Sequence, residues 1–115
     1  MLYAAALEAA GEIYRRVSWR DAASAVRAKV REQSWDGEWF VDNARRLPDG
    51  RLERTRNRTE TCQYYAFFFG AADRASHPEL WKRLVEEFGP DRKARGLHPE
   101  IHPSNAFVGN YLRME

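Results

Sequence analysis

The sequence predicts an all-α fold built from helical hairpins. Two amphipathic helices, expected at residues 2 to 17 and from Ser18 to about Gln33, follow each other with a short connection, so we expect them to be antiparallel neighbours. Further along, residues 64 to 72 are apolar or aromatic on every face, which is typical of a buried helix. Covering and buried helices that alternate in this way, with long loops between them, indicate an α/α barrel.

Composition and charge narrow the class of protein. The 115 residues suffice for one domain with a core. The composition, with 43% hydrophobic and 31% charged residues, is that of a globular rather than a disordered chain. The 19 Lys and Arg are nearly balanced by 17 Asp and Glu, so we expect neither nucleic acid nor an anionic membrane as a partner. The sequence contains no long apolar run and no signal pattern, which leaves the localisation unknown, with the cytoplasm slightly favoured.

The two N-terminal helices are predicted from spacing and capping. The first should cover the domain with one face, formed by Tyr3, Leu7, Ala10, Tyr14 and Val17. The second should begin with a capping box in which Ser18 is the cap and Asp21 its partner. Its inward residues should be Trp19, Ala22, Val26 and Val30.

A loop rich in tryptophan and carboxylates follows, with a turn at Asp36 and Gly37. One interpretation is that its aromatic rings stack on a polyhydroxylated ligand while its acids accept hydrogen bonds from it; the other is a tryptophan-anchored loop with solvated acids. The residues concerned are Trp35, Asp36, Glu38, Trp39, Asp42 and Asn43. A second turn at Asp49 and Gly50 predicts a small hairpin or irregular excursion within residues 40 to 58.

The buried helix should begin at Thr59, whose side chain is a suitable N-cap. This places Glu60 in the first turn, where the helix dipole favours an anion. Glu60 is therefore either a catalytic or ligand-binding carboxylate at the N-terminus of a buried helix, or a carboxylate that only stabilises the N-terminus of that helix. Cys62, the single cysteine, excludes a disulfide and a thiolate metal site, and we interpret it as a small buried hydrophobe.

Two more helices complete the chain. The first should start after Ser76, which is its expected cap, stop at Gly89 and lie on the outside. The second, residues 104 to 112, should be buried. Between them, His98 and His102 are four residues apart, but proline follows each of them, so we expect a loop or ligand contact rather than a metal site. We expect no cofactor.

Three segments resemble the six-hairpin glycosidases, and in particular the α-L-rhamnosidase-like group. These are residues 35 to 43, 59 to 70 and 105 to 112. The resemblance implies that residues 1 to 115 form an arc of an (α/α)6 toroid. It also implies a glycoside hydrolase that removes a terminal, rhamnose-like sugar with inversion through paired carboxylates.

The same resemblance suggests residue roles. Glu60 would be the catalytic base or a sugar-hydroxyl acceptor, and no residue can be matched to the general acid. The substrate contacts would be Trp35, Asp36, Glu38, Trp39, Asp42, Asn43 and Asn105.

The chain departs from that family in length, because a closed toroid of twelve helices needs roughly 300 residues or more. A shorter arc would expose the apolar side chains of Phe67, Phe68, Phe69 and Tyr111. We expect either a fragment, which we favour and which should be inactive by itself, or self-association through the exposed inner helices. The alternative functions are a carbohydrate- or partner-binding helical module without catalysis, and a structural interaction domain.

Overall fold

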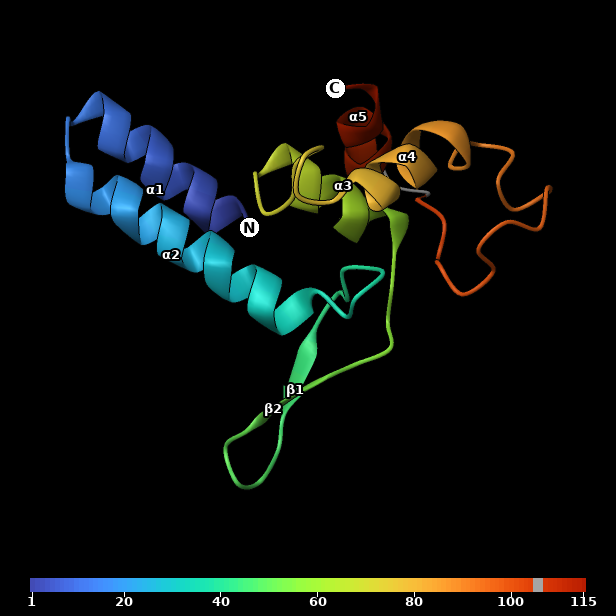
Figure 1. Cartoon of the computed structure of the whole chain (residues 1–115), viewed down its shortest axis with the longest axis horizontal. Coiled ribbons are helices and arrows are strands. Elements are labelled where there is room, and N and C mark those ends of the chain that lie inside the picture. The colour runs from blue at the N-terminus through green and yellow to red at the C-terminus, as the bar shows by residue number, and fades with distance from the viewer. Residues whose placement is uncertain (105–106) are drawn as a thin grey trace.

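The computed structural model describes residues 1–104 and 107–115. About half of these residues are helical, and the described elements also include one short antiparallel hairpin (Figure 1). In chain order the elements are α1 (Leu2–Ile13), α2 (Val17–Ser34), β1 (Ala44–Arg46), β2 (Leu52–Arg54), α3 (Glu60–Phe68), α4 (Pro78–Glu86) and α5 (Phe107–Met114).

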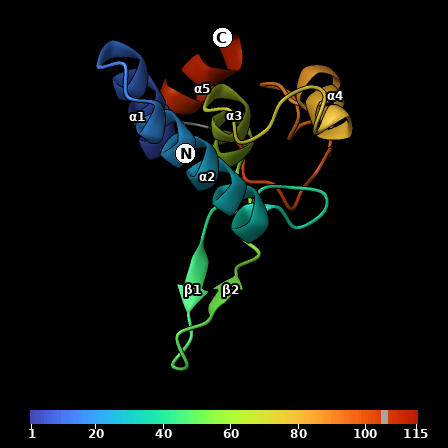
Figure 2. The same cartoon turned by 60° about the vertical axis from the view of Figure 1, so that its left-hand side comes forward.

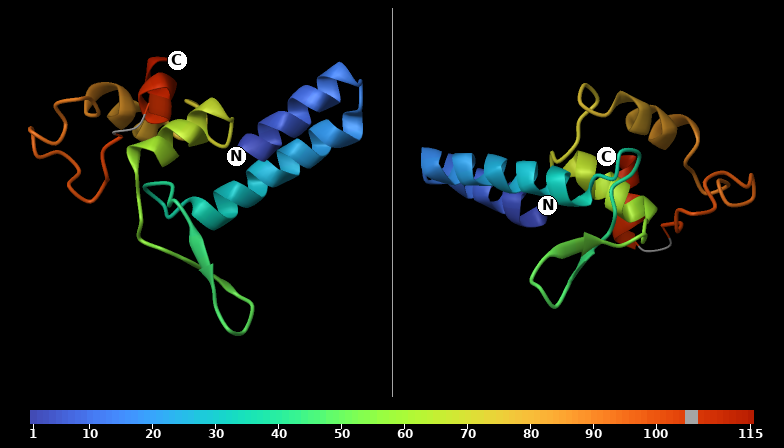
Figure 3. Two further views of the ribbon diagram at one scale, coloured as in Figure 1. Left: turned by 180° about the vertical axis from the view of Figure 1, so that it is seen from behind. Right: turned by 60° about the horizontal axis from the view of Figure 1, so that its bottom comes forward.

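The helices α1 and α2 form the expected antiparallel hairpin, which extends away from the other elements (Figures 1 and 3). Small residues allow the two helices to approach closely: Ala4 and Ala23 are fully buried, and a Cβ on Gly11 would lie 2.8 Å from the side chain of Arg20. The hairpin is tied to the rest of the chain through α2. Its Arg27 donates to the carbonyl of Phe69 at 2.8 Å, and Arg31 donates to that of Ala71.

The surface of this hairpin differs from the prediction. Tyr3 and Tyr14, expected to face the domain, are 65% and 67% exposed, and Trp19 is also exposed. The capping box is wrong as well, because α2 begins at Val17 with Arg16 as N-cap and no side-chain cap. Spacing identified the helices correctly, but which face is covered depends on elements that are distant in sequence.

The excursion between α2 and α3 contains the predicted hairpin. Strands β1 and β2 pair with Ala44 opposite Arg54 and Arg46 opposite Leu52, and the turn contains Gly50 with a φ of +85°. All six strand residues are exposed, and the hairpin projects away from the helices (Figure 2).

Helix α3 begins as predicted. The Thr59 hydroxyl accepts the backbone N–H of Cys62 at 3.1 Å, which confirms the cap. The helix ends at Phe68, four residues before the predicted end, because Gly70 adopts a φ of +70° and turns the chain. Helix α5 packs closely on α3, since a Cβ on Gly109 would lie 2.7 Å from the Thr61 hydroxyl.

The core lies between α3, α4 and the loops around them. Several of its largest members belong to loops rather than helices, among them Trp39, Phe40, Phe88 and Ile101. Helix α4 contributes Leu80, and its N-cap is His77 without a side-chain bond, so the prediction that Ser76 caps it is wrong. The prediction that the last helix is buried is wrong, because Phe107 of α5 is 84% exposed.

The predicted all-α arc of an (α/α)6 toroid is wrong. The described chain is a small mixed domain with five helices and a two-stranded sheet. Among the described elements, α1 and α2 form a hairpin of consecutive helices. Helix α3 approaches α5 closely and contacts the next helix, α4, through side chains such as Phe67 on Trp81, whose ring centroids are 5.3 Å apart. The physical reason is that loop side chains such as Trp39 and Ile101 occupy the core positions that an arc would fill with helices.

Candidate functional site

The carboxylate of Glu60 lies at the start of α3, where a loop from the C-terminal third of the chain joins it. The Thr59 cap starts the helix, and the backbone N–H of Glu60 donates to the carbonyl of His102 at 3.0 Å. Thr59 and His102 also form an isolated parallel bridge. The start of α3 is therefore held from two sides, which fixes the position of the Glu60 side chain.

Arg92 forms a buried ion pair with Glu60. Its Nε lies 2.5 Å from Oε1 of Glu60, and the two residues are 2% and 5% exposed. The remaining guanidinium nitrogens donate to backbone carbonyls of Leu97, His98 and Ile101 at 2.6–2.7 Å. Three further hydrogen bonds of the guanidinium therefore accompany the ion pair, as a buried charge requires.

The second oxygen of Glu60 is also held by the protein. Oε2 accepts the backbone N–H of Ser104 at 3.0 Å and the phenol of Tyr64 at 3.3 Å. Burial first, and then the charge of Glu60, raise the pKa of the Tyr64 phenol, so this phenol stays a donor. A carboxylate has about four acceptor positions, and three of those on Glu60 are occupied, which leaves one for a water molecule or a ligand hydroxyl.

A pocket of about 310 Å³ opens beside this carboxylate. Its polar groups include a carboxylate, an amide, a hydroxyl and two cationic side chains, and its lining consists of Glu60, Gly89, Pro90, Lys93, Pro103, Ser104, Asn110 and Arg113. Groups of this kind can form hydrogen bonds with several hydroxyls of a sugar. Among the described residues, Glu60 is the single carboxylate that lines this pocket.

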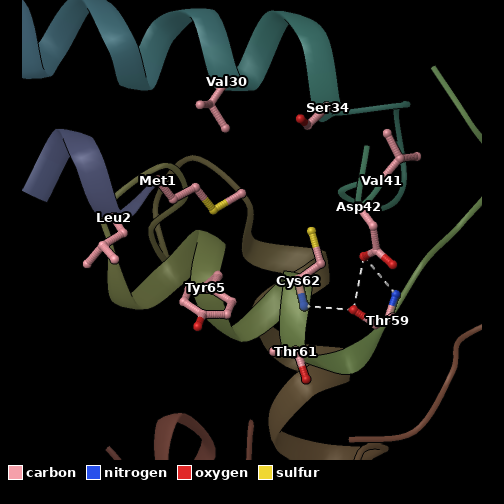
Figure 4. Close-up of a pocket in the computed structure, with 10 residues that line it drawn as sticks. All are labelled: Met1, Leu2, Val30, Ser34, Val41, Asp42, Thr59, Thr61, Cys62 and Tyr65. Atoms are coloured by element: carbon pink, nitrogen blue, oxygen red, sulfur yellow. Dashed lines mark hydrogen bonds between the residues drawn. The ribbon is translucent and has the colours of Figure 1, made fainter. Parts of the chain in front are cut away.

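A second, larger pocket of about 460 Å³ lies on the other side of the first turn of α3, below the N-terminus of α1 and the end of α2 (Figure 4). Asp42 lies at its edge, where one carboxylate oxygen accepts the backbone N–H of Thr59 at 3.2 Å and its hydroxyl at 2.9 Å. Figure 4 shows the other oxygen of Asp42 free of drawn bonds, and the rest of the wall is largely apolar, with Val30, Val41 and Tyr65.

The thiol of Cys62 points into this second pocket (Figure 4). Burial first, and then the negative charge of Asp42, raise its pKa to about 12. At neutral pH the group is therefore a protonated thiol, which is a poor nucleophile.

The structure places the other predicted carboxylates away from Glu60. Asp36 accepts the N–H groups of Glu38 and Trp39 and pairs with Arg58 at 2.6 Å. Burial alone would raise the pKa of Asp36, but these hydrogen bonds and the Arg58 charge outweigh it and lower that pKa. Glu38 pairs with Arg83 at 2.7 Å. Both acids thus stabilise the turn and its packing, and neither lines the Glu60 pocket.

The predicted aromatic contacts are divided between surface and core. Trp39 is fully buried, its ring is stacked on Phe88, and Arg83 lies over it, so it offers no face to a ligand. Trp35 is partly exposed and lines a pocket of about 350 Å³ that includes His77. Asn43 lies at the base of the β hairpin, bound to Thr55. Asn105 lies outside the described residues.

Sequence reasoning did not identify Arg92. It lies 32 positions from Glu60 in a basic, turn-rich loop, and no local pattern distinguishes it from Lys93 or Arg95. The two histidines have separate roles: His98 contacts Glu87 and packs on Trp39, whereas the backbone of His102 pairs with the start of α3. Within residues 1–104 and 107–115, no three potential metal ligands are grouped together.

No family model matches this chain, and no curated protein or solved structure is similar enough to indicate a family. None of the helices that the structure describes is long and apolar enough to span a membrane.

Proposed function

We propose that this chain contributes a carboxylate and sugar contacts to a glycoside hydrolase that removes a terminal, rhamnose-like sugar with inversion. The observation that carries the proposal is the Glu60 carboxylate, which three protein donors hold at the edge of a pocket while one acceptor position stays free. An inverting hydrolase needs one such carboxylate to activate water. The resemblance of residues 59 to 70 to the six-hairpin glycosidases supports the same role.

Glu60 would act by accepting a hydrogen bond from the attacking water or from a sugar hydroxyl. A carboxylate fixed in place loses little freedom when the ligand binds, which favours both binding and catalysis. Asn110 and Ser104 lie at the same pocket and can donate to further hydroxyls. The general acid, which must stand about 6.5 to 9.5 Å from the base, is not assigned to any residue of this chain.

A second candidate function is carbohydrate binding without hydrolysis. One observation favours it: Asp36 and Glu38 are paired with arginines, Asp42 is bonded to Thr59, and none of them lines the Glu60 pocket. A chain with one carboxylate at its sugar site would hold the ligand but would not cleave it.

The test is a titration of the isotope-labelled chain with L-rhamnose and D-glucose, followed by NMR. We expect the amide signals at Glu60, Ser104 and Asn110 to shift with rhamnose. Asn110→Ala should weaken this binding about tenfold without lowering the melting temperature, because Asn110 lines the pocket and is exposed. Glu53→Gln, on the distant β hairpin, is the control and should bind normally.

Hydrolysis separates the two candidates. The substrate is an aryl α-L-rhamnoside. Turnover by the wild type that is abolished in a folded Glu60→Gln variant would support the hydrolase. Near-normal turnover by this variant would refute the role of Glu60. Binding without turnover by the chain alone is expected of both candidates, because no general acid is assigned to this chain, so only turnover that depends on Glu60 separates them. If no amide near the pocket shifts with either sugar at tens of millimolar, both candidates are wrong.

A further inference from the structure

The segment that carries the β hairpin is unusually rich in arginine. Residues 44 to 58 contain six arginines, two carboxylates and no aromatic residue. The proposed function makes no use of them. The hairpin projects from the molecule (Figure 2), so its side chains are accessible from solvent.

The register of the hairpin separates its charges between two faces. Residues opposite each other in an antiparallel pair share a face, and successive residues alternate. Arg45 and Glu53 are opposite each other and form an ion pair at 2.5 Å, so their face is neutralised. Arg46 and Arg54 lie on the other face, with Ala44 and Leu52, and this face has no carboxylate within the strands.

The arginines on that second face have no anionic partner. Arg46 donates to the carbonyl of Gly50 at 2.9 Å, and Arg54 donates to the carbonyl of Trp35. Because a carbonyl is uncharged, these bonds do not neutralise the two guanidinium charges. Arg56 follows, also exposed. Among the described residues, no carboxylate oxygen lies within 4.0 Å of these three guanidinium groups. We call Arg46, Arg54 and Arg56 the unpaired arginine group.

We propose that the unpaired arginine group binds an acidic polysaccharide through the carboxylates of its sugar units. A guanidinium is planar and binds a carboxylate with two parallel hydrogen bonds. Two such groups on one face of the exposed hairpin, with Arg56 two residues beyond β2, match a polymer with repeated carboxylates. The choice of a saccharide over another carboxylate polymer rests on the proposed function.

Nucleic acid fits this surface less well. Proteins that hold single strands combine cations with aromatic rings on which bases stack, and this hairpin has no aromatic residue. Non-specific binding to duplex DNA is supported by more phosphate contacts than three arginines can supply. A carboxylated saccharide, in contrast, needs no stacking surface for its charged groups.

The test compares two triple variants of equal charge. Arg46→Gln/Arg54→Gln/Arg56→Gln removes the unpaired group, and Arg15→Gln/Arg16→Gln/Arg20→Gln removes three exposed arginines at the junction of α1 and α2. Binding to fluorescent carboxymethyl-dextran, unmodified dextran and oligothymidylate is followed by anisotropy. We expect wild type and the α1–α2 variant to bind carboxymethyl-dextran alike, and the hairpin variant to bind at least about tenfold more weakly.

Added salt should weaken the binding of carboxymethyl-dextran. Unmodified dextran should bind wild type and the hairpin variant equally weakly. Equal losses in both variants would mean that only overall charge matters and would overturn the proposal. Tighter binding of oligothymidylate through the same three arginines would identify a nucleic-acid surface instead and would also overturn it. The rhamnose titration at Glu60 uses a neutral sugar and other residues, so the two proposals can fail separately.

Discussion

Replacing Glu60 by Gln tests the buried ion pair with Arg92. The substitution keeps the shape of the side chain but removes the charge that compensates a guanidinium of 2% exposure. Breaking a buried pair in this way leaves an uncompensated charge and costs about 3 to 5 kcal/mol. For a small domain such a loss is a large part of the total stability.

Urea unfolding followed by tryptophan fluorescence measures this loss, since Trp39 is buried in the core beside His98. With a slope of about 1.5 kcal/mol per molar urea, the midpoint should fall by roughly 2 to 3 M. The matched control is Glu53→Gln. Its partner Arg45 is also at 2.5 Å, but the side chains are 49% and 70% exposed, so the expected loss is about 0 to 1 kcal/mol.

Two results would refute this reasoning. Equal midpoints for Glu60→Gln and Glu53→Gln would mean that the burial of the Glu60 pair has no energetic effect. The double variant Glu60→Gln/Arg92→Met removes both charges and should be more stable than Glu60→Gln alone, because no charge is then left unpaired. If it is less stable by the full sum of the single losses, the two residues are not coupled.

Three further predictions concern local interactions. The pKa of Asp36 is lower in the folded than in the unfolded chain, so the stabilisation from its carboxylate is fully present above the unfolded pKa, near 4, and is lost as the pH falls through the folded pKa. The difference in urea midpoint between wild type and Asp36→Asn should therefore disappear between pH 5 and pH 2. A difference that stays constant over this range would contradict the prediction. Because the pKa of Cys62 is about 12, its thiol should react with an aromatic disulfide at pH 8 at least about 100-fold more slowly in the folded than in the urea-unfolded chain. Equal rates would show that the thiol is not buried beside Asp42. Thr59→Ala removes the cap of α3 and should cost about 1 kcal/mol in unfolding experiments, whereas Thr59→Ser should be close to wild type; an equal loss in both would show that the hydroxyl is not what matters.

Local chemistry predicted part of the fold. The Thr59 cap, the hairpin around Gly50 and the pairing of the first two helices each depend on a few neighbouring residues, and the structure confirms them. These features need no knowledge of distant contacts, because a cap, a tight turn or a short connection satisfies its own backbone. For the same reason, the start of α3 was more predictable than its end, which Gly70 determines.

The arrangement of these elements could not be predicted in the same way. The aromatic loop left two interpretations open, a ligand platform and a tryptophan-anchored loop, and the sequence could not show that Trp39 lies in the core, where Phe88, 49 residues later, packs against it. The exposed tyrosines of α1 have helical spacing that is indistinguishable from that of a covered face. The partner of Glu60 was missed because Arg92 meets it across 32 positions of the chain, and only the folded loop around Leu97 and Ile101 holds the guanidinium in that place.

The way α2 is attached to the domain has a consequence for local opening. Apart from contacts of Met1 and Val30 with the core, the described links are polar: Arg27 and Arg31 donate to carbonyls just beyond the end of α3, and the carbonyl of Ser34 accepts the N–H of Val41. Breaking these few bonds frees the α1–α2 hairpin without disturbing Trp39 or Ile101. The amide protons of this hairpin should therefore exchange with solvent through a partial opening of the molecule. The free energy of this opening should be well below that of the opening through which the α3 amides exchange.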